Sequence, residues 1–290
     1  MRWARFDKRG AGQDNCRVMK LTISTLTCPD WTLAQIIEAC AAAGVGGVDF
    51  RGLGPEIDVT RLREFTLDLP LTLAEFRARG VAMPCFNTSV TLMVPSAQRW
   101  QEMLDEAHRY AQLAARSGTR FLRIFGGAIP RDVTREEALA TARRHLRQIS
   151  KICLTHETLP VVETHDAWST SRAMRELLHE FAADEAGVLW DVEHTCRAGE
   201  APGETLEALG RYVRHVHVKD SVRDGGKYIP KLLGEGDLPL GDVMRALKRA
   251  GYEGWVCLET ERRWHPEIAP APEVSLPHFS RFMRAMAGEG

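Results

Sequence analysis

The sequence predicts an α/β fold, a single (β/α)8 TIM barrel, from three observations. Strand-like and helix-like segments alternate from Met19 to the end of the chain. Eight strand-like segments can be distinguished, and amphipathic helices separate most of them. The length of 290 residues is usual for one such barrel. A doubly wound fold is disfavoured, because no Gly-x-Gly-x-x-Gly motif follows the first strand.

The predicted strands are short runs rich in β-branched and aromatic residues, and glycine or polar residues follow most of them. We expect them at residues 20–27, 47–51, 81–87, 120–125, 159–163, 188–191, 213–218 and 255–259.

Helices are predicted where apolar residues recur at helical spacing behind a capping residue. Thr134 and Glu137 have the spacing of a capping box, and Gly44 and Gly118 are expected to end two of the helices. We expect helices from Asp30 to Gly44, over 73–79, from Ser96 to Gly118, from Thr134 to about Cys153, from Asp242 to Gly251, and over 276–286.

The composition argues against several classes of protein. The formal net charge is −1 and the pI is about 6.8, so no overall positive field attracts nucleic acid or an anionic membrane. No apolar run approaches the roughly twenty residues of a membrane span. The seven cysteines are scattered and form no Cys-x-x-Cys motif, which is typical of reduced thiols in a cytoplasmic protein.

The first eighteen residues, 1–18, differ from the rest of the chain. They are basic, and they show neither helical periodicity nor the apolar centre of a secretory signal. We interpret them as a disordered leader, with Met19 as a candidate natural start of translation. The barrel domain is therefore expected to cover residues 19–290.

Four polar residues stand at the ends of four successive predicted strands, namely Glu163, Asp191, His217 and Glu259. In a barrel these ends meet at one face, where each strand can direct one side chain inward. Three carboxylates and one imidazole suit a divalent ion such as Mn²⁺, Mg²⁺, Co²⁺ or Zn²⁺, and the lack of cysteine argues against a closed structural zinc site. Each residue alone would more often be a helix cap or a salt-bridge partner. Together they predict one metal site.

Longer motifs contain these residues. They are Glu163-Thr-His165, Asp191-Val-Glu-His194, His215-Val-His217-Val-Lys219-Asp220, Gly234-Glu-Gly-Asp237 and Gly251-Tyr-Glu-Gly-Trp255-Val-Cys-Leu-Glu259. With these motifs the chain resembles the xylose isomerase-like TIM barrels, and among them the sugar phosphate isomerase/epimerase group, over about residues 19–287. That group includes keto-sugar 3-epimerases, hydroxypyruvate isomerases, inosose dehydratases and isomerases, and dehydroshikimate dehydratases. The motifs therefore define fold and metal site better than substrate.

The resemblance implies that Glu163, Asp191, His217 and Glu259 hold one divalent ion, and that Glu163 and Glu259 also move protons of the substrate. The implied activity is that of an isomerase or epimerase of a keto-sugar or a related polyhydroxy carbonyl compound. A proton next to a carbonyl is weakly acidic, so the ion must stabilise the enediolate that forms. Carboxylates on both sides can remove and return the proton. A hydroxyl group at the β position would instead leave, so a lyase of the inosose or dehydroshikimate dehydratase type is the alternative.

Three further residues are expected to contact the substrate. His194, three residues past Asp191, matches a substrate-contacting histidine of the family. Arg223 matches a position at which keto-sugar 3-epimerases place an arginine, although the tripeptide after His217 differs from theirs. His165 is interpreted as a substrate contact or as a support for the ligands, with a structural role as the alternative.

Two other function classes share this barrel. An abasic-site endonuclease is disfavoured, because that family carries additional histidines on earlier strands, whereas residues 86–88 and 125–127 contain none. The slightly acidic charge also does not suit nucleic acid. A non-catalytic sugar-binding barrel would not need two glutamates and a full set of ligands. The predicted partner is therefore a small carbohydrate, with no nucleic acid and no membrane, and a homo-oligomer is compatible with the sequence.

Overall fold

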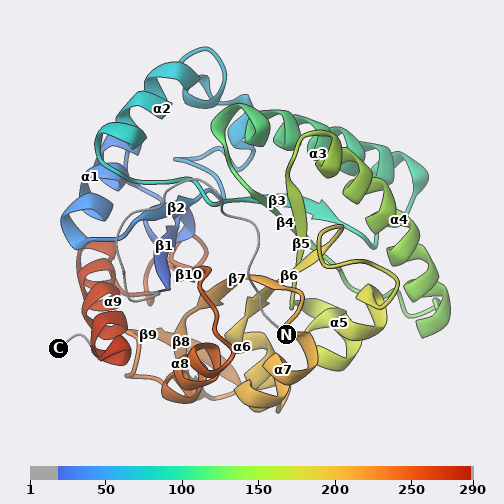
Figure 1. Ribbon diagram of the computed structural model, residues 1–290. Coiled ribbons are helices and arrows are strands. Elements are labelled where there is room, and N and C mark those ends of the chain that lie inside the picture. Colours follow the sequence, from blue (N-terminus) through green and yellow to red (C-terminus); the bar gives the residue numbers. More distant parts are fainter. Residues whose placement is uncertain (1–18, 289–290) are drawn as a thin grey trace.

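Eight parallel strands form the wall of a barrel (Figure 1). The computed structural model describes residues 19–288, so the predictions for residues 1–18 lie outside it. The strands follow the order β2-β1-β10-β7-β6-β5-β4-β3, and single bridges from Gly47 to Ala82 and from Phe50 to Phe86 bring the two ends of the sheet together. The predicted barrel is confirmed. The strands are β1 (Lys20–Ser24), β2 (Gly47–Asp49), β3 (Cys85–Thr91), β4 (Phe121–Phe125), β5 (Leu159–Glu163), β6 (Gly187–Asp191), β7 (Val213–Val218) and β10 (Trp255–Leu258).

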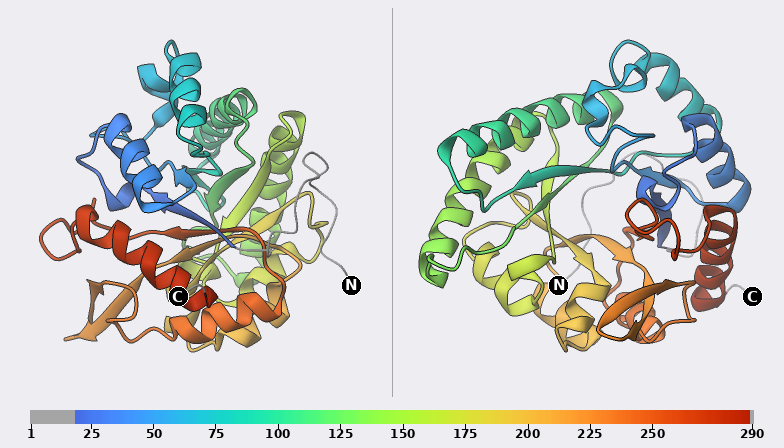
Figure 2. Two further views of the ribbon diagram at one scale, coloured as in Figure 1. Left: turned by 60° about the vertical axis from the view of Figure 1, so that its left-hand side comes forward. Right: turned by 180° about the vertical axis from the view of Figure 1, so that it is seen from behind.

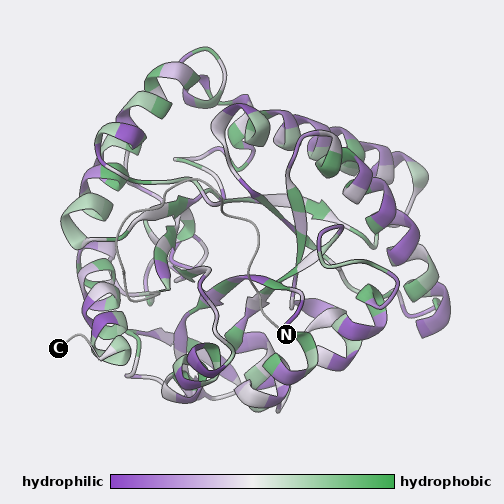
Figure 3. Ribbon diagram, viewed as in Figure 1, coloured by the Kyte–Doolittle hydropathy of each residue, from purple (hydrophilic) through white to green (hydrophobic). Residues whose placement is uncertain are grey.

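Helices surround the strands on the outside of the barrel (Figures 1 and 2). They carry hydrophilic residues along one side and hydrophobic residues along the other, as colouring by hydropathy shows (Figure 3). Among the described residues, no helix is both long and apolar enough to cross a membrane. The helices are α1 (Leu33–Ala43), α2 (Leu69–Ala78), α3 (Ala97–Ser117), α4 (Arg135–Thr155), α5 (Ser171–Leu178), α6 (Val192–Arg197), α7 (Pro202–Leu209), α8 (Leu240–Arg249) and α9 (Pro272–Ala287).

Capping boxes begin two of the long helices. At the start of α4, the Thr134 hydroxyl accepts a hydrogen bond from the Glu137 backbone, and the Glu137 carboxylate accepts one from the Thr134 backbone, as predicted. The cap of α1 differs from the prediction. It is Thr32, not Asp30, because Thr32 and Gln35 form a capping box that satisfies two backbone amides.

Several element boundaries are shifted from their expected positions: β1 ends at Ser24, β2 ends at Asp49 and α9 begins at Pro272. Three further shifts have a local reason. Helix α2 begins at Leu69, earlier than predicted, with Pro70 in the first turn, where its missing N–H does no harm. Helix α8 begins at Leu240, and Asp242 lies in its first turn instead of capping it. Strand β3 begins later than predicted, after Pro84, since proline cannot donate a hydrogen bond to a neighbouring strand.

An antiparallel hairpin that the eight-strand pattern does not contain follows β7. It consists of β8 (Asp220–Asp224) and β9 (Lys227–Lys231) and forms a sheet of its own. Gly225 and Gly226 make its two-residue turn, and their φ angles of 53° and 81° lie in the left-handed region that glycine adopts readily. Because β7 runs directly into the hairpin, this element projects from the end of the barrel at which the predicted ligands stand.

The interior of the barrel changes from apolar to charged along the strands. Cys85, Val161 and Leu189 form a small buried cluster, and Phe121 packs against it. The interior residues nearer the C-terminal ends of the strands are carboxylates, histidines and basic groups. This division gives the charged residues a rigid apolar base.

The pairing of β6 with β7 contains one irregular step. Val188 pairs with Val213, whereas the next residue, Leu189, pairs with His215. Strand β7 therefore advances by two residues while β6 advances by one, as in a β-bulge. On its other side β7 pairs regularly with β10.

Candidate metal centre

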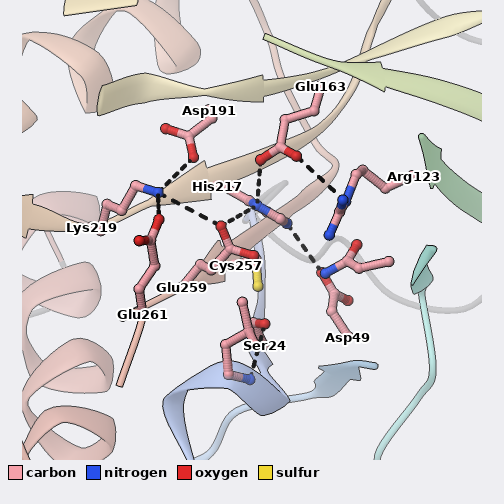
Figure 4. Close-up of polar contacts among 12 residues, drawn as sticks. Ser24, Asp49, Arg123, Glu163, Asp191, His217, Lys219, Cys257, Glu259 and Glu261 are labelled. Carbon is pink, nitrogen blue, oxygen red and sulfur yellow. Dashed lines mark hydrogen bonds and ion pairs between the residues drawn. The ribbon is translucent and has the colours of Figure 1, made fainter. Parts of the chain in front are cut away.

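The four predicted ligands meet at the C-terminal end of the barrel (Figure 4). Glu163 ends β5, Asp191 ends β6, His217 lies on β7, and Glu259 directly follows β10. One possible ligand atom of each residue lies within 4.8 Å of those of the other three, and all four residues are buried. The structure thus brings four residues that are far apart in the sequence into one cluster.

The strand register explains this arrangement. His217 pairs with Asp191 on one side and with Cys257 on the other, so these three residues stand at one level of the sheet. Side chains alternate along a strand, and Glu259, two residues after Cys257, therefore points to the same side as that residue. The positions of Asp191, His217 and Glu259 follow from this register.

Arg123 is a cation that faces the carboxylates. Its side chain on β4 is 2% exposed, and its Nε lies 3.4 Å from Glu163 Oε2. Burial alone would raise the pKa of Glu163, but the charges of Arg123 and His217 outweigh burial and hold that pKa well below its usual range. Glu163 is consequently a carboxylate, the form that binds a cation, at neutral pH.

Lys219 is the second cation. Its Nζ lies 3.0 Å from Asp191 Oδ2, 2.7 Å from Glu261 Oε1 and 3.8 Å from Glu259 Oε2. Burial would lower the pKa of Lys219, but the surrounding carboxylates, Asp191 first among them, raise it well above its usual value. Burial alone would raise the pKa of Asp191, but the charge of Lys219 lowers it, and the net shift of this pKa is downward. Lys219 and Asp191 are therefore both charged at neutral pH.

The imidazole of His217 presents its two nitrogens to different groups. Nδ1 lies 3.0 Å from Glu259 Oε2 and 3.7 Å from Glu163 Oε1, on the side of the proposed ligands. Nε2 lies 3.8 Å from Asp49 Oδ2 on the other side (Figure 4). Burial would lower the pKa of His217, whereas Glu259 and other groups raise it, and the net shift is strongly upward.

The cluster fits one divalent cation. In the part of the chain that the structure describes, His217 Nδ1 is buried among the carboxylates without a hydrogen bond of good geometry. Buried polar atoms normally have such a partner, and a bound ion would supply it. Three carboxylates and one imidazole are a donor set that Mn²⁺, Mg²⁺, Co²⁺ and Zn²⁺ all accept.

His165 and His194 lie together beside this cluster. Their ring centroids are 4.3 Å apart, and the rings meet edge to face. His194 Nε2 lies 3.8 Å from Asp191 Oδ2, and His165 Nδ1 lies 3.1 Å from Asp166 Oδ1. Both histidines are partly exposed, so each can reach a molecule that enters the mouth of the barrel.

Arg223 lies apart from the other predicted site residues. It is on β8 of the hairpin, its side chain is exposed, and its backbone N–H donates to Asp237 Oδ2 at 3.2 Å. In the described residues, none of its hydrogen bonds reaches the four-residue cluster. Contact between Arg223 and a substrate stays a prediction.

Asp220 explains two of the sequence motifs structurally. Its Oδ2 accepts hydrogen bonds from the backbone of Gly234 at 2.8 Å and of Gly236 at 3.0 Å. A Cβ on Gly236 would come within 2.0 Å of the Asp220 carboxylate, so only glycine fits there. The aspartate after Lys219 thus fixes the loop that follows the hairpin and does not join the metal cluster.

Sequence reasoning assigned no role at this site to Arg123, Lys219 or Asp49. The position of Lys219 could have indicated its role, because it follows His217 by two residues, directly after the end of β7. An arginine inside the otherwise apolar strand β4 is a similar signal. The sequence around Asp49 contains no such signal, because Asp49 ends a strand of only three residues and its partners are far away in the sequence.

A family model described as Xylose isomerase-like TIM barrel matches residues 37–285. The matched segment covers most of the chain and contains the whole four-residue cluster. The chain belongs to this family. As a xylose isomerase-like TIM barrel, it has the fold that its motifs indicated.

Named proteins that resemble this xylose isomerase-like barrel differ in activity. An inosose dehydratase from Clostridium botulinum is 28% identical over 107 residues, which cover 31% of this chain and only about a third, 34%, of that relative. The structure of an IOLI protein with a binding zinc atom aligns with a TM-score of 0.78 at 16% identity, over 93% of this chain and 99% of that one. The structure of L-ribulose 3-epimerase aligns with a TM-score of 0.74 at 12% identity, over 93% and 95%. These structural similarities show the fold alone.

Proposed function

We propose that this barrel is a divalent-metal-dependent isomerase or epimerase of a keto-sugar or a related polyhydroxy carbonyl compound. The observation that carries the proposal is the placement of Glu163 and Glu259. They come from β5 and β10, which lie on opposite sides of β7 in the sheet, and both approach Nδ1 of His217. A carbonyl compound bound between them would have a carboxylate on each side. The L-ribulose 3-epimerase of the same fold supports this class of reaction.

The proposed ligands of the ion are Glu163, Asp191, His217 and Glu259. When bound, the ion supplies a positive charge beside the carbonyl oxygen of the substrate and so makes the neighbouring C–H group more acidic. The zinc in the structure of the IOLI protein supports a metal in this fold.

The residues of the chain itself move the proton in the proposed reaction. A carboxylate oxygen of one glutamate takes the proton from the carbon next to the carbonyl. The other glutamate, which has first taken up a proton from solvent, gives that proton to the opposite face of the carbon. The two glutamates are not equivalent, because Arg123 lies 3.4 Å from Glu163 whereas Lys219 lies 3.8 Å from Glu259. Each therefore has its own electrostatic partner.

His165, His194 and Arg223 are the proposed substrate contacts. The two histidines are the better placed, because they lie against each other next to Asp191. Their ring nitrogens can donate hydrogen bonds to hydroxyl groups of a polyhydroxy substrate or accept them. Arg223 could contact a substrate only from the exposed hairpin.

A lyase is the second candidate. The pair of His165 and His194 favours it, because a protonated imidazole can give its proton to a departing hydroxyl group, which then leaves as water. The same first step, removal of a proton next to the carbonyl, would precede that loss. The inosose dehydratase among the similar proteins supports this reading.

One experiment separates these candidates. Metal-loaded protein is incubated in D₂O with a panel of ketoses, inososes, hydroxypyruvate and dehydroshikimate. An isomerase or epimerase should give a product of unchanged composition with solvent deuterium at the reacting carbon, and a lyase should give a product that has lost water. Product free of deuterium would reject proton transfer, and failure to convert any member of the panel would reject the proposed substrate class.

Variants test the two glutamates in the same assay. Glu163→Gln and Glu259→Gln should each reduce turnover by more than the roughly 10² to 10⁴-fold of general acid–base catalysis, because each residue is also a proposed ligand. The variant that lacks the returning acid should still exchange deuterium into the substrate. Full activity in either variant would exclude that glutamate from the reaction.

A further inference from the structure

Asp49 ends β2 and is completely buried. It lies beside His217, on the side of the imidazole that faces away from Glu163 and Glu259. Its Oδ1 accepts a hydrogen bond from the Thr22 hydroxyl at 3.1 Å, and its Oδ2 lies 2.5 Å from His215 Nε2. The core of the barrel thus contains a fixed carboxylate immediately behind His217.

The two nitrogens of His217 have different tasks at a metal site. Nδ1 faces Glu163 and Glu259, so it must be free of a proton to bind an ion. The proton of the neutral ring then belongs on Nε2. Nε2 has no hydrogen-bond partner among the described residues, and the carboxylate of Asp49 lies 3.8 Å from it. This separation is too long for a hydrogen bond but short enough for a strong interaction between charges in a buried site.

We infer that Asp49 is a positioning residue that orients the imidazole of His217 and keeps its proton on Nε2, so that Nδ1 is free to bind the metal. Thr22 and His215 hold the carboxylate of Asp49 in place. The inference rests on the proposed metal site and is independent of the substrate. Carboxylates beside the second ring nitrogen of a ligating histidine, most of them hydrogen-bonded to it, fix the imidazole in many metal sites. Their loss lowers metal affinity about 10 to 100-fold.

The same region contains a second group of potential ligands, formed by Asp49, His215, His217 and Cys257. One observation favours a hydrogen-bonded support over a second ion. Asp49 Oδ2 and His215 Nε2 are 2.5 Å apart, so they bond directly to each other and leave no room for an ion between them.

A double-mutant cycle on metal affinity tests whether Asp49 acts through His217. The dissociation constant for Co²⁺ is measured by competition with a chelator, without substrate. Asp49→Asn should raise it about 10 to 100-fold in the otherwise unchanged protein and by a similar factor in the Asp191→Asn background. In the His217→Ala background the same substitution should have no further effect. Equal effects in all three backgrounds, or no effect in the first, would overturn the inference.

His215→Gln is a second variant in case Asp49→Asn does not fold, and thermal unfolding of the metal-free proteins shows whether each variant is folded. His215→Gln leaves the charge of Asp49 but removes its closest hydrogen-bond partner. This substitution should therefore weaken Co²⁺ binding in protein that contains His217 and have no effect in the His217→Ala background. Cys257→Ser tests the second group of potential ligands and should leave one bound ion per chain. Two ions in the unchanged protein and one in this variant would overturn the inference in favour of a second site. If the unchanged protein binds no Co²⁺, the proposed metal site itself fails.

Discussion

Lys219 Nζ lies 3.0 Å from Asp191 Oδ2 inside the barrel, and neither side chain is more than 7% exposed. Removing two charges from water costs several kcal/mol each, which only close geometry offsets. The same ammonium group also faces Glu261 at 2.7 Å and Glu259 at 3.8 Å. One lysine therefore serves several carboxylates, and it neutralises part of the negative charge that a bound cation would otherwise have to balance alone.

Replacement of Lys219 should destabilise the metal-free protein more than the metal-loaded protein. Lys219→Met leaves buried carboxylates without their cation, and the free energy of unfolding in a chelator should fall by about 3–5 kcal/mol. Added Mn²⁺ or Co²⁺ should restore part of the loss, because the ion replaces the missing positive charge. Urea denaturation with and without metal measures both values. Lys248→Met, at an exposed position of α8, should change stability by less than about 0.5 kcal/mol, and an equal loss with and without metal would contradict the prediction.

Substitution of individual ligands should lower the metal content. Carefully prepared protein should contain close to one divalent ion per chain by elemental analysis. His217→Ala and Asp191→Asn should both reduce this occupancy while circular dichroism shows that the barrel is still folded. Arg223→Ala, at an exposed position outside the cluster, should keep full occupancy. Full occupancy in both ligand variants would show that the ion binds elsewhere.

Gly126→Ala should destabilise the protein through a clash with Trp168. A Cβ at Gly126 would come within 2.1 Å of the Trp168 ring, which is fully buried and donates a hydrogen bond to the carbonyl of Gly127 at 3.0 Å. Overpacking of this kind costs about 1–3 kcal/mol, which thermal unfolding detects easily. Gly203→Ala is the matched control in α7, where no atom lies within 4 Å of the new Cβ. That control should instead raise stability by up to about 1 kcal/mol, since alanine favours a helix.

The ion pair of Asp58 and Arg109 should make stability depend on pH. Arg109 Nη2 donates to Asp58 Oδ2 at 2.9 Å, and Thr60 also donates to this carboxylate. Burial alone would raise the pKa of Asp58, but Thr60 and Arg109 outweigh it, and the pKa lies below the ordinary 3.8. A lowered pKa stabilises the folded state above the unfolded pKa, and this contribution is lost as pH falls through the folded pKa. Asp58→Asn should therefore cost about 1 kcal/mol at pH 7, and the cost should shrink below about pH 4.

Urea denaturation of wild type and Asp58→Asn at a series of pH values checks this. The two curves of stability against pH should approach each other on the acid side. A difference that stays constant down to pH 3 would mean that the charge of Asp58 does not contribute.

Much of the scaffold could be predicted, because it depends on local periodicity. Strand β5 occupies the predicted residues 159–163, and the helices α3 and α4 begin at the predicted caps Ser96 and Thr134. The hairpin could not be found in this way. Its strand β9 contains Pro230, which weakens a strand signal, and β8 is largely polar.

The candidate site divides in the same way. The carboxylates and the histidine could be predicted, because each follows an apolar strand that the sequence marks clearly. The groups around them depend on contacts between distant segments. Asp49 and His215 are 166 residues apart in the chain, and no local pattern connects them. Supporting residues of this kind become visible only when the barrel closes.

The irregular step between β6 and β7 decides which side of the wall each residue of β7 presents. In an uninterrupted ladder Leu189, an interior residue, would stand beside Arg214 instead of His215. Alternation would then turn His217 outward toward the helices. One additional residue upstream in β7 therefore determines whether the side chains of the His-x-His-x-Lys pattern point into the barrel or out of it. A related chain could keep every letter of the motif, lack that residue, and have no metal site.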